Sequence, residues 1–197
     1  GEKAFCAGAS FDELKAIKNK EEGLQFFSSF AHVINAMRTC PKFIIGRIHG
    51  KCVGGGIGLA AAVDYAIALE SVEIKLSELA IGIGPFVVGP AIERKIGLSA
   101  FTQLAIDATM WRNSDWARRK GLFAELHPDT EVMDESIRRL ADTLVHSSPE
   151  AMMEMKKIFW KGTEHWDELL IERAATSGKL VLSEFTKKAI EKFKTKN

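Results

Sequence analysis

The chain has 197 residues, of which 46% are hydrophobic and 27% are charged, and its net charge is +1. This composition is typical of a globular protein, and the length allows one domain or one domain with a helical appendage. The balance of 27 basic and 26 acidic residues argues against nucleic-acid binding, and the longest apolar stretch is too short to predict a membrane span.

The cysteines and histidines predict neither a disulfide scaffold nor a metal site. Cys6, Cys40 and Cys52 are odd in number and widely spaced, and the five histidines lack metal-ligand spacing. Because no secretory signal opens the sequence, we expect a cytoplasmic protein.

The first elements in chain order alternate between strands and helices. Residues 1–10 resemble the end of a strand that enters a turn, so the first strands of the domain are expected to be missing from the chain. Further along, residue patterns predict a helix over 21–38, a strand over 43–48, a glycine-rich turn over 50–56, a helix over 57–63 and short strands over 65–69 and 74–76. This order predicts the α/β class.

The second half of the sequence predicts amphipathic helices. Apolar residues recur at helical spacing from Ile137, after Pro149 and from Trp166. We therefore divide the chain into a core over 1–127 and a helical region over 128–197. The apolar faces of these helices suit a core or contacts between subunits.

A glycine cluster, Gly54 to Gly58, separates a predicted strand from a helix of small residues. Its spacing does not match a dinucleotide-binding fingerprint or a phosphate-binding P-loop. Two interpretations remain: a tight turn that allows close packing, or an anion or oxyanion site at a helix N-terminus.

Two further segments contribute candidate chemistry. Gly8 permits a turn that exposes the N–H of Ala9, and two such loops could together stabilise a thioester oxygen that becomes an enolate. Glu78 lies between apolar residues and glycines, where burial would raise its pKa and suit it to proton transfer. The alternative is that Ser77 or Glu78 only caps a helix.

These features in this order resemble the enoyl-CoA hydratase/isomerase (crotonase) superfamily. The matching segments are Lys-Ala-Phe-Cys-Ala-Gly-Ala over 3–9, His-Gly-Lys-Cys-Val-Gly-Gly-Gly over 49–56, Asp64, Ser77-Glu78 and Gly84-Pro85. The resemblance covers essentially the whole chain and is closest in motif to methylglutaconyl-CoA-type hydratases. It implies a crotonase-type ββα spiral core with a C-terminal helical region that forms oligomers.

The resemblance implies that the chain binds acyl-CoA thioesters and uses no other cofactor. The N–H groups of Ala9 and Gly55 would form the oxyanion hole, the backbone at Ala7 and Ala9 would contact coenzyme A, and Glu78 would be the catalytic acid and base. Such a protein is expected to be a homotrimer or hexamer.

Within the family, the predicted reaction is hydration, and isomerisation is the alternative. The wider motif match favours an enoyl-CoA hydratase, with 3-methylglutaconyl-CoA or a related branched ester as substrate. However, one of the two glutamates of well-known hydratases is replaced by Gly58, which favours a 3,2-enoyl-CoA isomerase with Glu78 as its single acid and base. The aspartate of dehalogenase-type relatives is replaced by Phe86.

Three further hypotheses accompany this assignment. Arg94 or Lys95 could hold a carboxylate on the substrate, and Phe11, Phe86 and Trp111 either shape the acyl pocket or are ordinary core aromatics. A non-catalytic relative that binds coenzyme A or RNA is the alternative from another class; the retention of Glu78 and the absence of a basic stripe argue against it.

Overall fold

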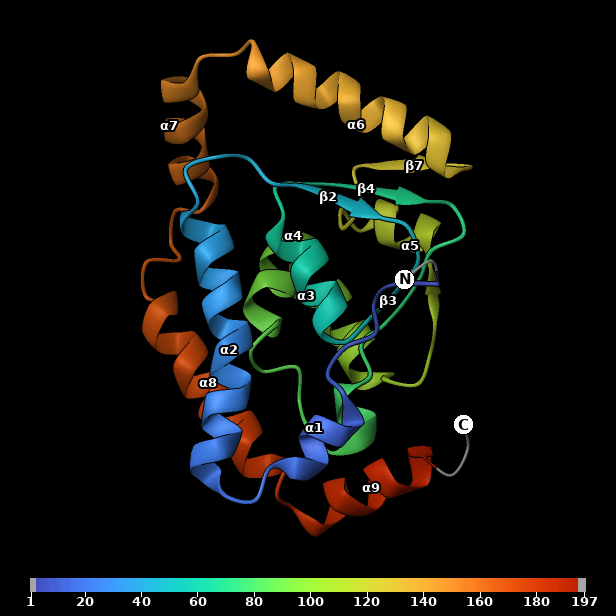
Figure 1. Cartoon of the computed structure of the whole chain (residues 1–197), viewed down its shortest axis with the longest axis vertical. Coiled ribbons are helices and arrows are strands. Elements are labelled where there is room, and N and C mark those ends of the chain that lie inside the picture. Colours follow the sequence, from blue (N-terminus) through green and yellow to red (C-terminus); the bar gives the residue numbers. More distant parts are fainter. Residues whose placement is uncertain (1–2, 195–197) are drawn as a thin grey trace.

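The computed structural model describes residues 3–194 (Figure 1). The strands are β1 (Ala4–Cys6), β2 (Ile45–Ile48), β3 (Lys51–Val53), β4 (Tyr65–Leu69), β5 (Glu73–Lys75), β6 (Arg112–Asn113) and β7 (Glu125–His127). The helices are α1 (Phe11–Ala16), α2 (Lys20–Thr39), α3 (Gly55–Ala62), the 3-10 helix η1 (Glu78–Ile81), α4 (Gly89–Ile106), α5 (Ser114–Arg119), α6 (Thr130–Val145), α7 (Pro149–Phe159), α8 (Trp166–Leu180) and α9 (Glu184–Lys194). The predicted α/β class is confirmed.

The strands form two small sheets. One has the spatial order β1-β3-β5-β6 and the other β2-β4-β7. All neighbouring strands are parallel except β5 and β6. Two predictions were wrong in detail: the strand predicted over 43–48 begins at Ile45, and the glycine-rich turn over 50–56 contains β3. A strand of three residues next to glycines carries too little periodicity to be detected.

Helix α3 lies in the centre of the core. Almost all of its side chains are small, and its residues from Gly56 to Gly58 and from Ala60 to Ala62 are buried. Alanine favours helix, and a helix that is apolar on every side is stable only when it is enclosed. Helix α3 packs against α2 and α4 on one hand and against β1 and β3 of one sheet on the other, which fixes its position.

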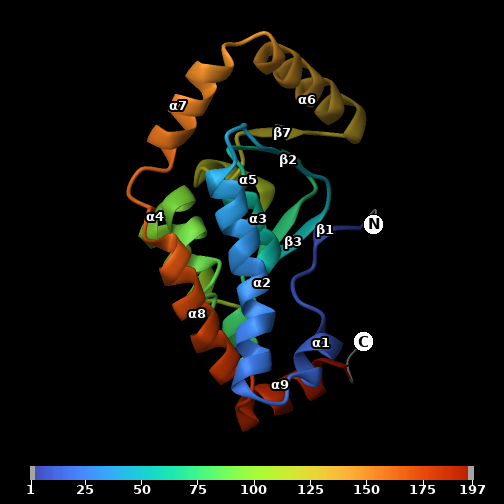
Figure 2. The ribbon, with the colours of Figure 1, turned by 60° about the vertical axis from the view of Figure 1, so that its left-hand side comes forward.

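The C-terminal helices pack back onto the first half of the chain. Figures 1 and 2 show α8 running alongside α2. The two backbones are in contact at Gly23 and Gly178. A methyl group added to Gly23 would lie only 2.6 Å from the carbonyl oxygen of Gly178. Leu170 and Ala174 belong to the same apolar cluster as Ile34 of α2. The division at residue 127 coincides with the end of β7, although both regions contribute to one core.

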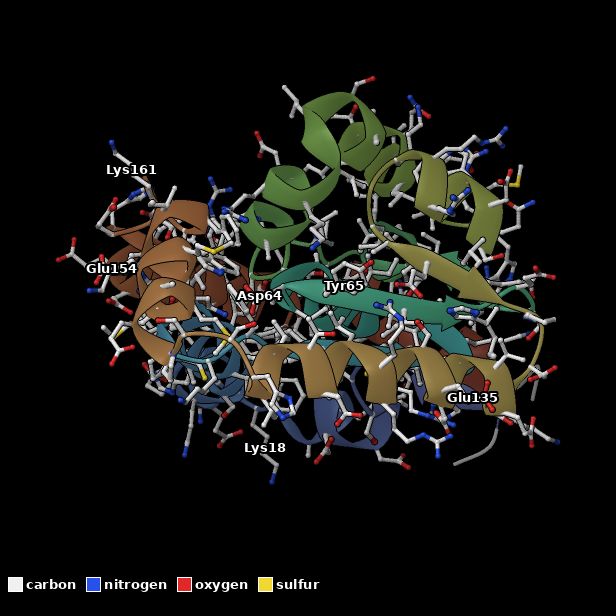
Figure 3. All side chains as sticks on the ribbon, turned by 90° about the horizontal axis from the view of Figure 1, so that it is seen from above. Lys18, Asp64, Tyr65, Glu135, Glu154 and Lys161 are labelled. Atoms are coloured by element: carbon white, nitrogen blue, oxygen red, sulfur yellow. The ribbon has the colours of Figure 1, made fainter. Side chains whose placement is uncertain are left out.

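A buried ion pair joins α7 to the end of α3. Asp64 accepts hydrogen bonds from the Lys156 ammonium, the Trp160 indole N–H and the Ile44 backbone N–H, the last at 2.8 Å. The side chains of Asp64 and Lys156 are 8% and 4% exposed. Figure 3 places Asp64 directly before β4. The carboxylate therefore secures two helices and a loop that are distant in sequence.

Candidate active site

Two glycine-containing loops meet at the N-terminus of α3. Gly8 has φ +84°, and a methyl group added to it would lie 4.0 Å from the backbone nitrogen of Gly55. The loop that contains Gly8 and Ala9 is thus adjacent to the first residue of the helix. Within residues 3–194, neither the Ala9 nor the Gly55 N–H donates a hydrogen bond to protein. Both groups remain available to an acceptor on a ligand.

Close backbone approach explains the glycine at position 56. A methyl group there would lie 2.7 Å from the carbonyl oxygen of Cys6, which no side chain tolerates. Gly54, directly before the helix, has φ +55°, a backbone conformation that favours glycine. The sequence alone left a packing role and an oxyanion role as alternatives. In the structure the same turn packs closely and leaves N–H groups unpaired.

The Glu78 side chain reaches this turn from η1. A methyl group on Gly54 would lie 2.9 Å from Glu78 Oε1, so the carboxylate lies against the residue that precedes Gly55. Its other oxygen, Oε2, is buried and has no hydrogen-bond partner among the described residues. Ser77 precedes η1 but its side chain makes no capping hydrogen bond. The capping interpretation therefore does not explain why a carboxylate is placed here.

Burial raises the pKa of Glu78 from 4.5 to about 7, although a hydrogen bond with its own backbone offsets part of this effect. The charged form loses its hydration and gains no cationic partner. A carboxyl group with a pKa near 7 exchanges protons readily at neutral pH. Glu78 is therefore suited to act as both a base and an acid.

The raised pKa predicts a pH-dependent loss of stability. Between pH 4.5 and 7 the unfolded chain ionises at Glu78 while the folded chain retains the proton, so folding becomes less favourable as the pH rises. Relative to the E78Q variant, the wild-type free energy of unfolding should fall by about 3 kcal/mol across this window and then stay level. Urea unfolding of both proteins from pH 4 to pH 8 measures this, and parallel curves would contradict it.

Gly58, where the resemblance implies the second glutamate of the well-known hydratases, is closed by packing. A methyl group on Gly58 would lie 2.5 Å from Val88 Cγ1, 2.7 Å from Val88 Cβ and 3.5 Å from the Phe30 ring. Even the first carbon of a glutamate side chain does not fit there. The described part of the chain therefore presents Glu78 without the partner that two-glutamate hydratases have at this helix.

Substituting Gly58 should test this packing. We expect Gly58→Ala to lower the free energy of unfolding by about 1–3 kcal/mol, because the extra methyl group overpacks the core. Urea unfolding measures the change. In a double-mutant cycle with Val88→Gly, which removes both close carbons, the two effects should be less than additive. Full additivity would contradict the close contact.

The aromatic residues predicted for the acyl pocket are distributed over three places. Phe11 packs in a small apolar cluster with Ile81 and Ile83, next to η1, and the Phe86 ring covers Gly84. In contrast, Trp111 lies under the ammonium groups of Lys51 and Lys75, 4.8 and 4.3 Å from the ring centre. Phe11 and Phe86 thus flank the turn that holds Glu78, whereas Trp111 lies directly before β6 and contacts β3 and β5.

The placement of Arg94 and Lys95 contradicts the hypothesis that they hold a substrate carboxylate. The Lys95 ammonium donates hydrogen bonds to the carbonyl oxygens of Val63 and Asp64, just past the C-terminus of α3. The Arg94 guanidinium lies 4.3 Å from the centre of the Trp160 ring. An eight-residue helix is about 12 Å long, so both cations lie at the opposite end of α3 from Gly55.

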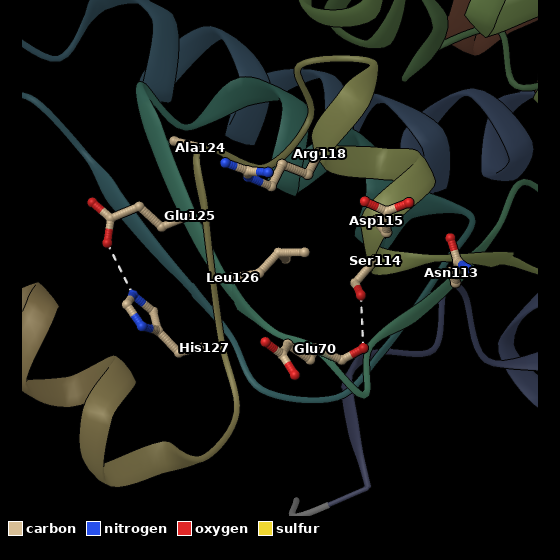
Figure 4. A pocket seen from close by; sticks show the side chains of 9 residues that line it. All are labelled: Glu70, Asn113, Ser114, Asp115, Arg118, Ala124, Glu125, Leu126 and His127. Atoms are coloured by element: carbon tan, nitrogen blue, oxygen red, sulfur yellow. Dashed lines mark hydrogen bonds and ion pairs between the residues drawn. The ribbon is translucent and has the colours of Figure 1, made fainter.

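A large cavity lies away from Glu78, and no pattern in the sequence predicted it. It has a volume of about 610 Å³ and is formed by the end of β4, by α5 and by β7. Figure 4 shows Glu70, Asp115 and Arg118 around it. Its lining also includes Glu125, which accepts hydrogen bonds from Tyr65 and Ser136 and pairs with His127. None of the predicted site residues lines this cavity.

Comparison with known proteins identifies the family. The family model described as enoyl-CoA hydratase/isomerase matches residues 1–196. The chain belongs to this family. The crotonase resemblance inferred from the glycine turns and Glu78 is confirmed.

Among the described residues, no group of three or more His, Cys, Asp or Glu side chains could hold a metal ion, and no helix is long and apolar enough to cross a membrane.

Curated members of the enoyl-CoA hydratase/isomerase family include several named activities. The chain is 28% identical to a short-chain-enoyl-CoA hydratase of Clostridium acetobutylicum, in a match that covers 83% of this chain and 62% of that protein. It is 25% identical to a peroxisomal Delta(3,5)-Delta(2,4)-dienoyl-CoA isomerase of Arabidopsis thaliana, covering 88% and 66%. It is 29% identical to a human mitochondrial methylglutaconyl-CoA hydratase, covering 77% and 44%. Hydratases and isomerases of this family are therefore similarly distant.

Solved structures in the enoyl-CoA hydratase/isomerase family share the fold. A crystal structure of an enoyl-CoA hydratase from Bacillus halodurans superposes with a TM-score of 0.87 at 22% identity, covering 98% of this chain and 78% of that one. An enoyl-CoA hydratase from Mycobacterium avium gives a TM-score of 0.85 at 22% identity, covering 98% and 73%. The expected crotonase-type fold is confirmed.

Proposed function

We propose that this chain catalyses proton transfer on an enoyl-CoA thioester, with Glu78 as its single acid and base. The N–H groups of Ala9 and Gly55 hold the thioester oxygen, whose negative charge grows as the enolate forms. The α3 dipole adds partial positive charge at the same point. The backbone of Ala7, which is exposed beside Ala9, contacts the coenzyme A portion of the substrate. The reaction uses no further cofactor.

The observation that carries this proposal is the Glu78 carboxylate against Gly54, together with the lack of space for a side chain at Gly58. Isomerisation of a 3-enoyl-CoA to a 2-enoyl-CoA needs one group that removes a proton from the carbon next to the carbonyl and returns it two carbons further along. Glu78 suits both steps because burial holds its pKa at about 7. The closed position at Gly58 favours this reaction over two-glutamate water addition, since the second carboxylate has no space.

Hydration of a branched enoyl-CoA such as 3-methylglutaconyl-CoA is the second candidate. The similarity to the human methylglutaconyl-CoA hydratase and the motif over 54–59 with Ser77-Glu78 favour it. In this reaction Glu78 handles the proton, and the source of water activation is the substrate's own carboxylate or Glu78 itself.

Mass spectrometry in heavy water distinguishes the two reactions. The protein is incubated separately with 3-hexenoyl-CoA and with 3-methylglutaconyl-CoA, and the molecular masses of the products are measured. Conversion of the 3-enoyl ester to the 2-enoyl ester with deuterium incorporation and without gain of water supports isomerisation. Gain of one water by the methylglutaconyl ester supports hydration. The absence of both, with E78Q behaving as the wild type, contradicts the proposal.

We also propose that the chain forms a homotrimer or hexamer through its C-terminal helices. Val145 at the end of α6 and Ile158 of α7 are 79% and 69% exposed, which is costly for apolar side chains that remain in water. Figure 2 shows α6 and α7 projecting from the body of the fold. Light scattering after size-exclusion chromatography should give a trimeric or hexameric mass, and a monomer at micromolar concentration would contradict this assignment.

A further inference from the structure

Two cysteines that are far apart in sequence lie opposite each other on neighbouring strands. Cys6 on β1 and Cys52 on β3 are in-register partners in a parallel pair, with a register irregularity between Ala4 and Cys6. Neighbouring strands lie about 4.8 Å apart, within the Cα separation of roughly 4.4–6.8 Å that a disulfide bridges. Both thiols are free in this structure.

The two side chains face the same interior. A methyl group on Gly56 would lie 2.9 Å from Cys6 Cβ, so the Cys6 side chain points to the start of α3. Cys52 is completely buried in the cluster that also contains Ile57 and Ala60 of that helix. Burial raises the pKa of the Cys52 thiol, and the proximity of Cys6 raises it further. Of these two cysteines, only Cys6, which is half-buried, is open to a reagent from solvent.

We propose that Cys6 and Cys52 form a reversible intramolecular disulfide when the protein meets a peroxide. Such a bond differs from a structural disulfide, because the reduced chain already folds with both thiols free. The third cysteine, Cys40, follows the C-terminus of α2 and has no part in the pair. The sequence analysis did not reveal this pair because strand pairing, not sequence spacing, brings the two residues together.

The oxidation proceeds in two steps. The Cys6 sulfur attacks one oxygen of hydrogen peroxide and the O–O bond breaks, so that Cys6 becomes a sulfenic acid, and the leaving hydroxide takes the Cys6 proton and departs as water. The Cys52 sulfur then bonds to the Cys6 sulfur, the S–O bond breaks, and the departing oxygen takes the Cys52 proton and leaves as a second water. The two sulfurs are oxidised and the peroxide is reduced. The protonated, buried Cys52 makes the second step the slow one.

The disulfide would act on the two candidate oxyanion donors together. Cys6 lies three residues before Ala9, and Cys52 lies three residues before Gly55. The bond holds the Cβ atoms of the two cysteines about 3.5–4.5 Å apart, and the adjustment of both strands to this spacing moves the loops that follow them. Because Gly56 already approaches Cys6 closely, the start of α3 has no space to absorb the movement. The formation of the disulfide does not depend on the proposed function, whereas its effect on turnover does.

Peptide mapping after oxidation tests the bond itself. The full chain is treated with hydrogen peroxide, blocked with iodoacetamide and digested with trypsin without reductant. We expect peptide 4–15 linked to peptide 52–75, restored to free thiols by dithiothreitol. Cys40→Ala is the matched control and should form the same link. Cys6→Ala and Cys52→Ala should not, and Cys6→Ala keeps the test valid if the buried substitution at Cys52 unfolds the chain.

Turnover of the enoyl-CoA substrate, measured on the same samples, tests the consequence. We expect oxidation to lower it at least about tenfold in the wild type, since losing one oxyanion donor costs about 10²–10³-fold, and dithiothreitol to restore it. A link to Cys40, a link between two chains, or oxidation of Cys6 to a sulfinic acid without a link would overturn the disulfide. A linked protein with unchanged turnover would overturn its effect on the loops. If no sample turns over, the proposed function fails and the peptide map still decides the disulfide.

Discussion

Glu78→Gln is expected to lower the turnover of an enoyl-CoA substrate by about 10²–10⁴-fold, which is the usual contribution of a positioned acid and base. The amide occupies nearly the same volume but cannot accept the proton that the carboxylate removes. Because the wild-type carboxylate is buried without a hydrogen-bond partner on Oε2, the variant should remain folded. The thioester should still bind, so kcat should fall much more than KM changes.

Glu93→Gln provides the matched control for this experiment. Glu93 lies on α4 and its side chain is exposed to solvent, so this substitution should leave turnover unchanged.

The wild-type rate should also rise with pH through a midpoint near 7, where Glu78 loses its proton. Equal turnover by E78Q and wild type would show that another group transfers the proton.

Asp64→Asn is expected to destabilise the fold by about 3–5 kcal/mol, the usual result of removing one partner of a buried ion pair. The Lys156 ammonium is only 4% exposed and would lose its counterion. Asp64 also accepts a hydrogen bond from the Trp160 indole N–H, and the neutral amide oxygen of asparagine would accept this bond less strongly. Urea unfolding at neutral pH gives the change in free energy directly.

A double substitution separates the lost pair from the lost volume. Asp64→Leu combined with Lys156→Met removes both charges, and it should recover much of the stability that either single substitution loses. Asp134→Asn is the control at an ion pair of the surface: Asp134 pairs with Arg47 in solvent, so its effect on stability should be small. Equal losses at Asp64 and Asp134 would contradict the role of burial.

The glycine turns and Glu78 could be located from the sequence because their local chemistry is distinctive. Glycines between a strand and a helix of small residues indicate a close backbone approach, and the structure has one at Gly56. The helix over 57–63 was predicted only slightly late, since α3 begins at Gly55. The apolar neighbours of Glu78 in the sequence predicted burial and an upward pKa shift, and burial does raise its pKa in the structure. The roles of Ala7, Ala9, Gly55 and Glu78 stay predictions until substrate is tested.

The sequence could not predict features that depend on direction and on long-range contacts. Arg94 and Lys95 follow the Glu78 turn in the chain, but α4 carries them to the far end of α3, where Lys95 binds carbonyl oxygens. The large cavity beside Glu70 and the partnership of Cys6 with Cys52 likewise arise only from strand order. Residue spacing reports neighbours on one element and contains no information about which elements meet.

The last helix of the chain covers the turn that holds Glu78. A methyl group on Gly82, directly after η1, would lie 2.5 Å from the Phe185 ring, and Ile190 packs in one cluster with Ile81 and Ile83. Proteolytic removal of α9 would therefore uncover η1, the short helix on which Glu78 lies. Because burial raises the pKa of Glu78, the pKa of this residue in the trimmed chain should fall below about 7. The acidity of one residue would thus depend on a segment about a hundred positions further along the chain.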